Sequence, residues 1–269
     1  MKLSKTIGQY RDRILRFVTD DSPPVFYSFL ISIYRVAHPG KNSSIVYPVN
    51  GFWKVRSHDE EYYTVRNNIE RGSKRLQKLK YDRYTIDGFC EVELDDLVVD
   101  VGAYVGEFSM SASQRARHVI AIEPDPSSYR CLQKQTEGES NITVVNELPH
   151  EESGTGTFKS AVDGSESSVL NVDKGEYVEI QLESNPLDDI LDELGVADVD
   201  FLKMDAEGAE PEVLRGIKSI PVTKFAIDVG EERAGKTSTE EVRSILAERG
   251  YKCRVRKDQN GDQILFAVK

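Results

Sequence analysis

Residues 97–125 read LVVDVGAYVGEFSMSASQRARHVIAIEPD. The stretch opens with an apolar run that ends in Asp100, and two glycines, Gly102 and Gly106, follow closely. A segment of helical pattern comes next, and after it a second apolar run that ends in Glu123. Strand, glycine loop, helix, strand and acid in this order build a nucleotide-type pocket at the carboxyl ends of two parallel strands.

The spacing of the glycines distinguishes this loop from two known phosphate-binding loops. Asp-x-Gly-x-x-x-Gly lacks the third glycine of the dinucleotide pattern GxGxxG, which counts against NAD. It also lacks the lysine and hydroxyl of the P-loop. Glycines let a backbone approach a ligand closely, and Glu123 is placed to accept hydrogen bonds from ribose hydroxyls. The alternative is that Glu123 caps the helix beginning at Pro126, and we favour ribose binding.

Composition excludes several classes of protein. The 39% hydrophobic and 30% charged residues are typical of a globular chain that can bury a core. The net charge of −11 counts against a general nucleic-acid binder, because such affinity depends on neutralising phosphates. The three cysteines, Cys90, Cys131 and Cys253, have no CxxC or CxxH spacing. They fit a reducing compartment, and hence a cytoplasmic location, without a zinc site or disulfide framework.

We expect residues 1–85 to form an N-terminal extension or cap, and residues 86–269 to form the main domain. Apolar residues recur at helical spacing over 3–17, and no apolar core of a signal peptide is visible there. The apolar run 25–37 is shorter than the ~20 residues of a spanning helix and contains Arg35. A core or docking helix is favoured for it, and peripheral membrane contact is the alternative.

The remaining pattern alternates between strand and helix. Strands are expected within 45–57 and at 97–99, 119–122, 141–146, 199–204, 225–229, 251–255 and 264–268, and helices at 60–70, 107–116, from 126, and at 187–194, 209–214 and 238–250. A capping box at 238–241 opens the last helix, and Asn260-Gly261 is a hairpin turn between the last strands. The glycine-rich stretch 148–183 indicates hairpins or a loop-rich insertion. The expected fold is α/β, a helix-flanked parallel sheet with an antiparallel edge.

A second informative stretch, VDFLKMDAEGAEPEVLRGI, covers residues 199–217. Its strand ends in Asp205, and Lys203 points the same way because strand side chains alternate with period two. Acids at Glu207 and Glu210 favour the N-terminus of the following helix, which is a structural reason for one of them. Three acids are also a weak indication of a divalent metal, but no Asp-Asn pair on another strand supports it, so no metal is expected.

The motifs DVGAYVGEFS, IEPDP and FLKMDAEGAEPEVLRG together resemble the FkbM family of S-adenosylmethionine-dependent methyltransferases. The resemblance covers about residues 80–255, and K-x-D-x-E-G-x-E is its more specific motif. Leu187-Asp188 matches a family pair, while Asp228 stands where a glutamate is expected. The resemblance implies the class I methyltransferase (Rossmann-like) fold, a mostly parallel seven-stranded sheet with an antiparallel C-terminal strand, and S-adenosyl-L-methionine as cofactor.

The resemblance further implies methyl transfer to a hydroxyl of a sugar, glycan or other small molecule. Expected cofactor-binding residues are Asp100, Gly102, Ala103, Tyr104, Gly106, Glu123, Pro124 and Asp125. Expected catalytic residues are Asp205 on the acceptor side, Lys203, which would orient Asp205 or stabilise a developing alkoxide, and Glu207. A buried ion pair with a neighbouring carboxylate is the alternative role of Lys203.

Other readings of the chain stay open. A macromolecular methyltransferase is disfavoured because residues 205–208 lack the Asn/Asp-Pro-Pro-aromatic turn of amino-methylating DNA enzymes. A non-catalytic binding module with this fold is the other alternative. The basic run 71–83, RGSKRLQKLKYDR, is either a solvated helix face or a patch that steers an anionic substrate. The acceptor is expected to contact the insertion 148–183 and the extension 1–85.

Overall fold

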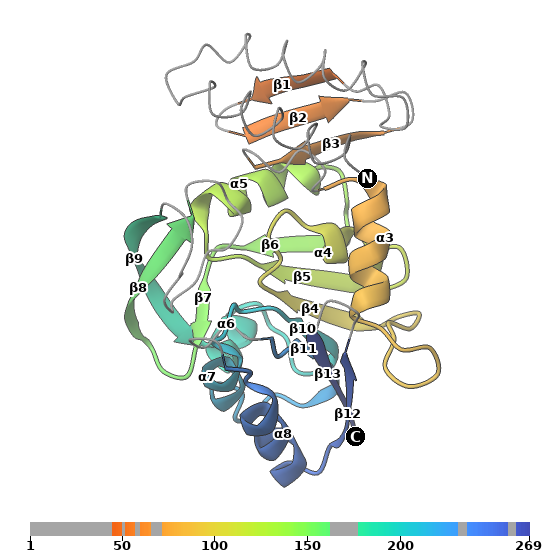
Figure 1. Cartoon of the computed structure of the whole chain (residues 1–269), viewed down its shortest axis with the longest axis vertical. Helices are drawn as coiled ribbons and strands as arrows, with labels where there is room; N and C mark the ends of the chain where they lie inside the picture. The colour runs from red at the N-terminus through yellow and green to blue at the C-terminus, as the bar shows by residue number, and fades with distance from the viewer. Residues whose placement is uncertain are drawn as a thin grey trace, which may run out of the picture. The chain divides into compact units, whose positions relative to one another are not determined.

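The computed structural model describes residues 45–49, 52–56, 60–65, 72–161, 177–230, 236–257 and 262–269 (Figure 1). The helices expected within 3–37 and the turn expected at 260–261 lie outside these residues. The chain divides into two compact units, of which one ends at Tyr62 and the other comprises Tyr63–Lys269. This division falls before residue 85, so the helix within the basic run belongs to the larger unit.

The first three strands form a small sheet, in the order β1 (Ile45–Val49), β2 (Phe52–Arg56) and β3 (Glu61–Thr64). β1 and β2 pair antiparallel, which confirms the strand pattern expected within 45–57. The helix expected at 60–70 is wrong over β3. Tyr62 and Thr64 are buried, Glu61 is exposed and Tyr63 is half-buried, and this alternation is the period of a strand.

The larger unit is built on a seven-stranded sheet in the order β12-β13-β11-β10-β4-β5-β6. These strands are β4 (Leu97–Val101), β5 (His118–Ile122), β6 (Ile142–Val145), β10 (Val199–Met204), β11 (Val222–Asp228), β12 (Lys252–Lys257) and β13 (Gln263–Val268). Neighbours from β11 to β6 pair parallel, whereas β13 runs antiparallel to β11 and β12. The expected mostly parallel sheet with an antiparallel C-terminal strand is confirmed. Strand order reverses between β4 and β10, and ligands bind at such a switch point.

The helices of this unit are α3 (Lys74–Arg83), α4 (Glu107–Ala112), α5 (Pro126–Gln135), α6 (Leu187–Glu193), α7 (Glu210–Arg215) and α8 (Thr239–Glu248). α5 begins as expected, because Asp125 accepts hydrogen bonds from the amides of Ser127 and Ser128 ahead of a first-turn proline. Among the described residues, no helix has the length and apolar character needed to cross a bilayer.

Two helix predictions need correction. α4 ends at Ala112, one turn before the expected residue 116. Ser238 precedes α8, but its side chain caps no amide of that helix, so the predicted capping box is wrong. The Ser238 hydroxyl instead lies 3.5 Å from Glu210 Oε2 of α7. Ser238 thus contacts a residue of another helix in place of the amides of α8.

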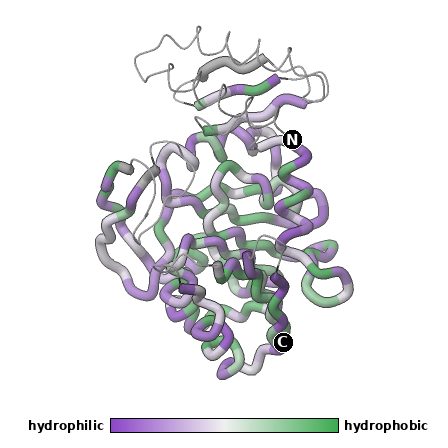
Figure 2. Tube along the Cα trace, viewed as in Figure 1, coloured by the Kyte–Doolittle hydropathy of each residue, from purple (hydrophilic) through white to green (hydrophobic). Residues whose placement is uncertain are grey.

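The hydrophobic core lies on both faces of the seven-stranded sheet, whose strands are mainly hydrophobic in Figure 2. Phe201 packs on one face with Tyr84, directly after α3, and with Phe108 of α4. Its neighbour Leu202 packs on the other face with side chains of α6, α7 and α8. Burial on both faces explains the continuous apolar runs of the central strands.

A second three-stranded sheet occupies the glycine-rich stretch. It consists of β7 (Leu148–His150), β9 (Tyr177–Pro186) and β8 (Gly154–Ala161) in that order. β9 pairs antiparallel with the whole of β8, and β7 pairs parallel with the end of β9. The expectation of hairpins within 148–183 is confirmed for the described residues, and residues 162–176 lie outside them.

Candidate functional site

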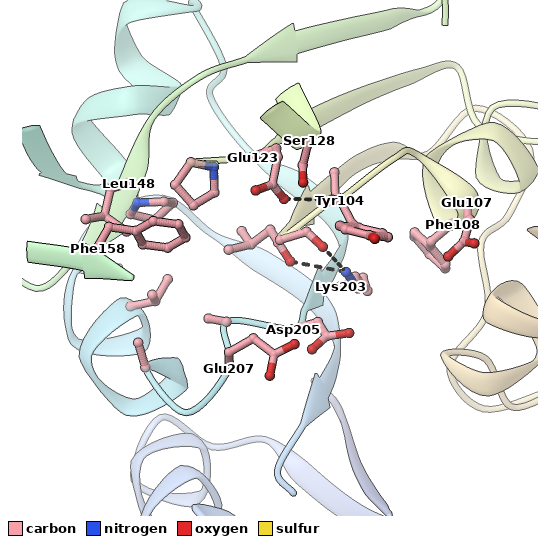
Figure 3. A pocket seen from close by; sticks show the side chains of 18 of the residues that line it. Tyr104, Glu107, Phe108, Glu123, Ser128, Leu148, Phe158, Lys203, Asp205 and Glu207 are labelled. Atoms are coloured by element: carbon pink, nitrogen blue, oxygen red, sulfur yellow. Dashed lines mark hydrogen bonds between the residues drawn. The ribbon is translucent and has the colours of Figure 1, made fainter. Parts of the chain in front are cut away.

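A cavity with about 950 Å³ free of protein atoms opens at the switch point between β4 and β10 (Figure 3). The loop after β4, the end of β5 and the turn after β10 line it, and Leu148, Pro149 and Phe158 of the small sheet add an apolar side. The insertion therefore forms part of the cavity wall, and its contact with an acceptor stays a prediction.

The structure brings most of the predicted site residues together in this wall: Gly102, Ala103, Tyr104, Glu123, Pro124, Lys203, Asp205 and Glu207. Three others do not line the cavity. Asp100 is completely buried behind the loop, Gly106 begins α4, and Asp125 caps α5. Each of the three serves an internal contact, and their part in cofactor binding stays a prediction.

Gly102 is required by packing inside the protein. It has φ +70°, and a Cβ atom there would lie 1.9 Å from the backbone oxygen of Asp205. Gly106 is similar, since its Cβ would lie 2.7 Å from a side-chain carbon of Leu132. These glycines thus allow the loop to close on β10 and α5. Close approach to a ligand remains a prediction for them.

Glu123 holds the glycine loop in a strained conformation. Tyr104 has φ +55°, a left-handed conformation that costs a non-glycine residue roughly 1–2 kcal/mol. The amide of Tyr104 donates to Glu123 Oε2 at 2.7 Å, and that of Asp125 donates to Oε1 at 2.8 Å. Burial, together with the charge of Asp125, raises the pKa of Glu123 to about 8. The alternative that Glu123 caps α5 is wrong, because Asp125 is the cap.

Lys203 ties β10 to the same loop. Its buried Nζ lies 2.9 Å from Asp100 Oδ1 and donates to the carbonyl oxygens of Gly102 at 2.7 Å and Val101 at 3.3 Å (Figure 3). Burial lowers its pKa, but the charges of Asp100 and Asp205 outweigh this and raise it. Its two hydrogen bonds go to backbone carbonyl oxygens and its charge faces Asp100, so these contacts are internal, and a role of Lys203 toward the acceptor stays a prediction. The structure shows the buried ion pair that was the alternative role of Lys203.

The turn after β10, like the glycine loop, contains a left-handed residue beside a buried glutamate that accepts backbone hydrogen bonds. Glu207 lines the cavity with φ +49°, also in the left-handed region. The completely buried Glu210 accepts hydrogen bonds from the amides of Ala206 and Gly208, both at 3.0 Å. Burial raises the pKa of Glu210 to about 7. One of the two acids therefore has a structural role, as expected, and Glu207 is the one presented to the cavity.

Polar side chains in and directly after α3 surround Asp205. Tyr84, directly after α3, donates its hydroxyl to Asp205 Oδ2 at 2.7 Å, and Lys80 Nζ lies 3.6 Å from the same oxygen. Burial raises the pKa of Asp205, but Lys80, Lys203 and the Tyr84 hydroxyl outweigh it and hold that pKa well below its usual range. Asp205 is thus an ionised carboxylate in the cavity wall.

Lys80 and Tyr84 are two site residues that the sequence did not predict individually. Within the basic run, Lys74 and Lys78 are exposed as a solvated face would be, whereas Lys80 lines the cavity. Nothing in the local pattern distinguishes Lys80 from these neighbours except its position on the buried side of α3. Tyr84 carries no local signal at all, because its partner is a residue far along the chain.

Comparison with family models identifies residues 100–253, more than half of the 269 residues, with the model described as Methyltransferase FkbM domain. Comparison with curated proteins found no match.

Among solved structures, Methyltransferase FkbM from Methylobacillus flagellatus KT is 23% identical, with 69% of this chain and 46% of that chain covered and a TM-score of 0.47. Fibrillarin from Aeropyrum pernix, with natively bound S-adenosyl-L-methionine, is 14% identical, with 84% and 99% covered and a TM-score of 0.47. Precorrin-6y C5,15-methyltransferase from Geobacter metallireducens GS-15 is 12% identical, with 77% and 95% covered and a TM-score of 0.48. The chain spans less than half of the Methylobacillus protein.

Proposed function

The chain belongs to the FkbM methyltransferase family, whose cofactor is S-adenosyl-L-methionine, and we propose that it methylates a hydroxyl oxygen of a sugar, glycan or other small molecule. The observation that carries the proposal is an ionised carboxylate, Asp205, in the wall of the cavity at the switch point. A carboxylate there accepts the hydrogen bond of an acceptor hydroxyl and orients its oxygen.

The cavity wall fits the cofactor by its chemistry. Four acidic side chains line it, Glu107, Glu123, Asp205 and Glu207, against the two ammonium groups of Lys80 and Lys203. Even with Glu123 largely protonated at neutral pH, acids outnumber the ammonium groups. This excess of acid suits a sulfonium cation. The apolar side formed by Leu148, Pro149 and Phe158 suits an aromatic base. Glu123 would hold the ribose hydroxyls, and Tyr104 and Ala103 would line the same part of the site.

The chain's own residues have modest tasks in such a reaction. The bound cofactor supplies an activated methyl group. Asp205 would accept the hydrogen bond of the attacking hydroxyl and take up its proton as the new bond to oxygen forms. Glu207, on the following turn, would bind a second hydroxyl of the acceptor. Lys203 keeps the glycine loop against β10, and Leu148 and Phe158 would exclude water.

The charge of the cavity also bears on the acceptor. The excess of carboxylates disfavours an anionic acceptor, so the steering role suggested for the basic run 71–83 is no part of the proposal. A neutral polyhydroxyl acceptor suits a wall of hydrogen-bond acceptors beside an apolar side. We also propose a cytoplasmic location, which the three unpaired cysteines support.

Calorimetry with S-adenosyl-L-methionine is the first test of this function. We expect saturable binding, and then transfer of a radiolabelled methyl group from the cofactor to a panel of free sugars and methyl glycosides. Radioactivity should appear in a product that resists base hydrolysis, as an ether does and an ester does not. Absence of binding would leave the chain as a non-catalytic module, whereas a base-labile product would exclude ether formation.

The affinity for S-adenosyl-L-methionine should depend on pH through Glu123. Its pKa of about 8 means that the carboxyl group is largely protonated at neutral pH. Ribose hydroxyls that donate to the carboxylate favour the ionised form and lower this pKa, so binding releases a proton below about pH 8. Affinity should therefore rise with pH, at most about tenfold per pH unit, and level off above about pH 8.

Calorimetry in buffers of different ionisation enthalpy measures the released proton directly. In E123Q the affinity should be lower and nearly independent of pH, whereas E139Q, which alters an exposed acid, should behave as the unaltered chain does. If the chain releases no proton near pH 7, Glu123 does not contact the ribose as an ionising group.

A further inference from the structure

The side of the site formed by α3 lies outside residues 100–253, which match the family model. Arg83 and Tyr84 follow Lys80 by three and four residues, so each is a neighbour of Lys80 on this side of the helix. This side meets the carboxyl ends of two strands, β10 and β11. Lys80 and Tyr84 contact Asp205, and Arg83 Nη2 lies 2.5 Å from Asp228 Oδ2.

Tyr84 is held rigidly in this position. It is completely buried, and its ring packs edge-on against Phe108, with centroids 5.9 Å apart and planes at 80°. Arg256 of β12 fixes the chain around it by donating to the carbonyl oxygens of Asp82 at 3.0 Å and Thr85 at 2.9 Å. The hydroxyl therefore has no room to turn away from the ends of the strands.

The single hydroxyl proton of Tyr84 has two acceptors within reach. Oη lies 2.7 Å from Asp205 Oδ2 and 3.3 Å from Asp228 Oδ2. Asp228 is already paired with Arg83, so the shorter contact to Asp205 receives the proton. Burial and these two carboxylates raise the pKa of Tyr84 well above its usual value. Tyr84 thus stays a donor and takes no part in proton transfer itself.

The two oxygens of Asp205 are placed in different surroundings. Oδ2 accepts from Tyr84 and lies near Lys80, whereas the structure shows no hydrogen bond to Oδ1 from any described residue. A carboxylate held through one oxygen can present the other in a fixed direction. This asymmetry is what an acceptor hydroxyl needs, because in-line attack depends on the orientation of its oxygen.

We propose that Tyr84 is a positioning residue for methyl transfer, which holds Asp205 through Oδ2 and leaves Oδ1 for the acceptor hydroxyl. The proposal rests on the proposed function and adds to it a residue from outside the family-matched segment. Its effect is on the orientation of Asp205, so the loss of the Tyr84 hydroxyl should lower kcat and leave the binding of the cofactor unchanged.

Tyr84→Phe tests this, with Tyr81 in the last turn of α3 as a matched control. Tyr81 also stacks on Phe108, and its hydroxyl only approaches the carbonyl oxygen of Val92 at 3.5 Å. With the panel sugar that is turned over fastest, Y84F should lower kcat about tenfold or more. The calorimetric affinity for S-adenosyl-L-methionine should stay within about twofold. Y81F should leave both within about twofold.

A double-mutant cycle separates positioning from a general structural role. If Tyr84 acts through Asp205, Y84F in a D205N background should change kcat by less than about twofold. The same cycle in urea unfolding needs no substrate. There, Y84F should raise the unfolding equilibrium constant about tenfold or more in the unaltered chain and much less in D205N.

The outcomes distinguish this proposal from the proposed function. Equal kcat in Y84F and Y81F would overturn the positioning role. So would a Y84F change that lowers kcat in the D205N background by the same factor as in the unaltered chain. If no variant transfers a methyl group to any sugar, the proposed function fails. Coupling between Tyr84 and Asp205 in the unfolding cycle would then still support their contact. If the unfolding cycle showed no coupling, the contact itself would be overturned as well.

Discussion

Replacement of Asp205 by asparagine is expected to lower kcat for methyl transfer about 100-fold or more. Asparagine keeps the size of the side chain but loses the charge that receives the hydroxyl proton of the acceptor. The hydrogen bond from Tyr84 and the nearby Lys80 hold Asp205 ionised in the unaltered chain. Steady-state kinetics with the best sugar of the panel, together with calorimetry of S-adenosyl-L-methionine, measure the effect.

Asp200 provides a control on the same strand. It lies toward the opposite end of β10, where its carboxylate accepts a hydrogen bond from the amide of Leu97 at 2.7 Å. D200N makes the same chemical change away from the cavity and should leave kcat within about threefold. An unimpaired D205N variant would remove Asp205 from the acceptor side, and Glu207 would become the next candidate.

The strands of the larger unit were the most predictable part of the fold. Runs such as VDFLKM are apolar on both faces and end at an acid, so both the element and its carboxyl end can be read locally. Errors occurred where tertiary contacts override local pattern. β3 was read as a helix, and Ser238 contacts Glu210 in place of the amides of its own helix.

The candidate site was predictable where strand ends determine it. The loops after β4, β5 and β10 had to meet once the sheet was inferred, so Tyr104, Glu123 and Asp205 were expected together. The buried contacts of the site residues were not predictable, because local sequence does not indicate which buried polar groups pair with one another. Lys203 pairs with Asp100, and Tyr84 meets Asp205 at the carboxyl end of β10.

The two turns that flank the cavity are built alike. Each presents a left-handed non-glycine residue, Tyr104 in one and Glu207 in the other. In each, a buried glutamate accepts two backbone hydrogen bonds, Glu123 in the first and Glu210 in the second. Strained residues of this kind persist only where the surroundings hold them, and they concentrate at functional sites. The acids of the two motifs thus shape the backbone as much as they supply charge.

The loop after β4 should be far less tolerant of a side chain at Gly102 than its backbone angle alone implies. Gly102 and Gly88 have nearly equal φ, +70° and +68°, but a Cβ at Gly88 would meet nothing within 4 Å. G88A should therefore cost only the conformational strain, about 1 kcal/mol in the free energy of unfolding. At Gly102 a Cβ would lie 1.9 Å from the Asp205 carbonyl oxygen, and a backbone atom cannot rotate aside.

G102A should consequently lose about 3 kcal/mol or more, because relief of the overlap has to separate the glycine loop from β10 and stretch the hydrogen bond from Lys203 to Gly102. Urea unfolding of both variants measures the difference, and calorimetry should show that G102A also loses affinity for S-adenosyl-L-methionine while G88A keeps it. Equal destabilisation of the two variants would contradict the argument, since backbone strain alone would then account for both. A stable G102A that no longer binds the cofactor would instead show that the loop separates from β10 at little energetic cost.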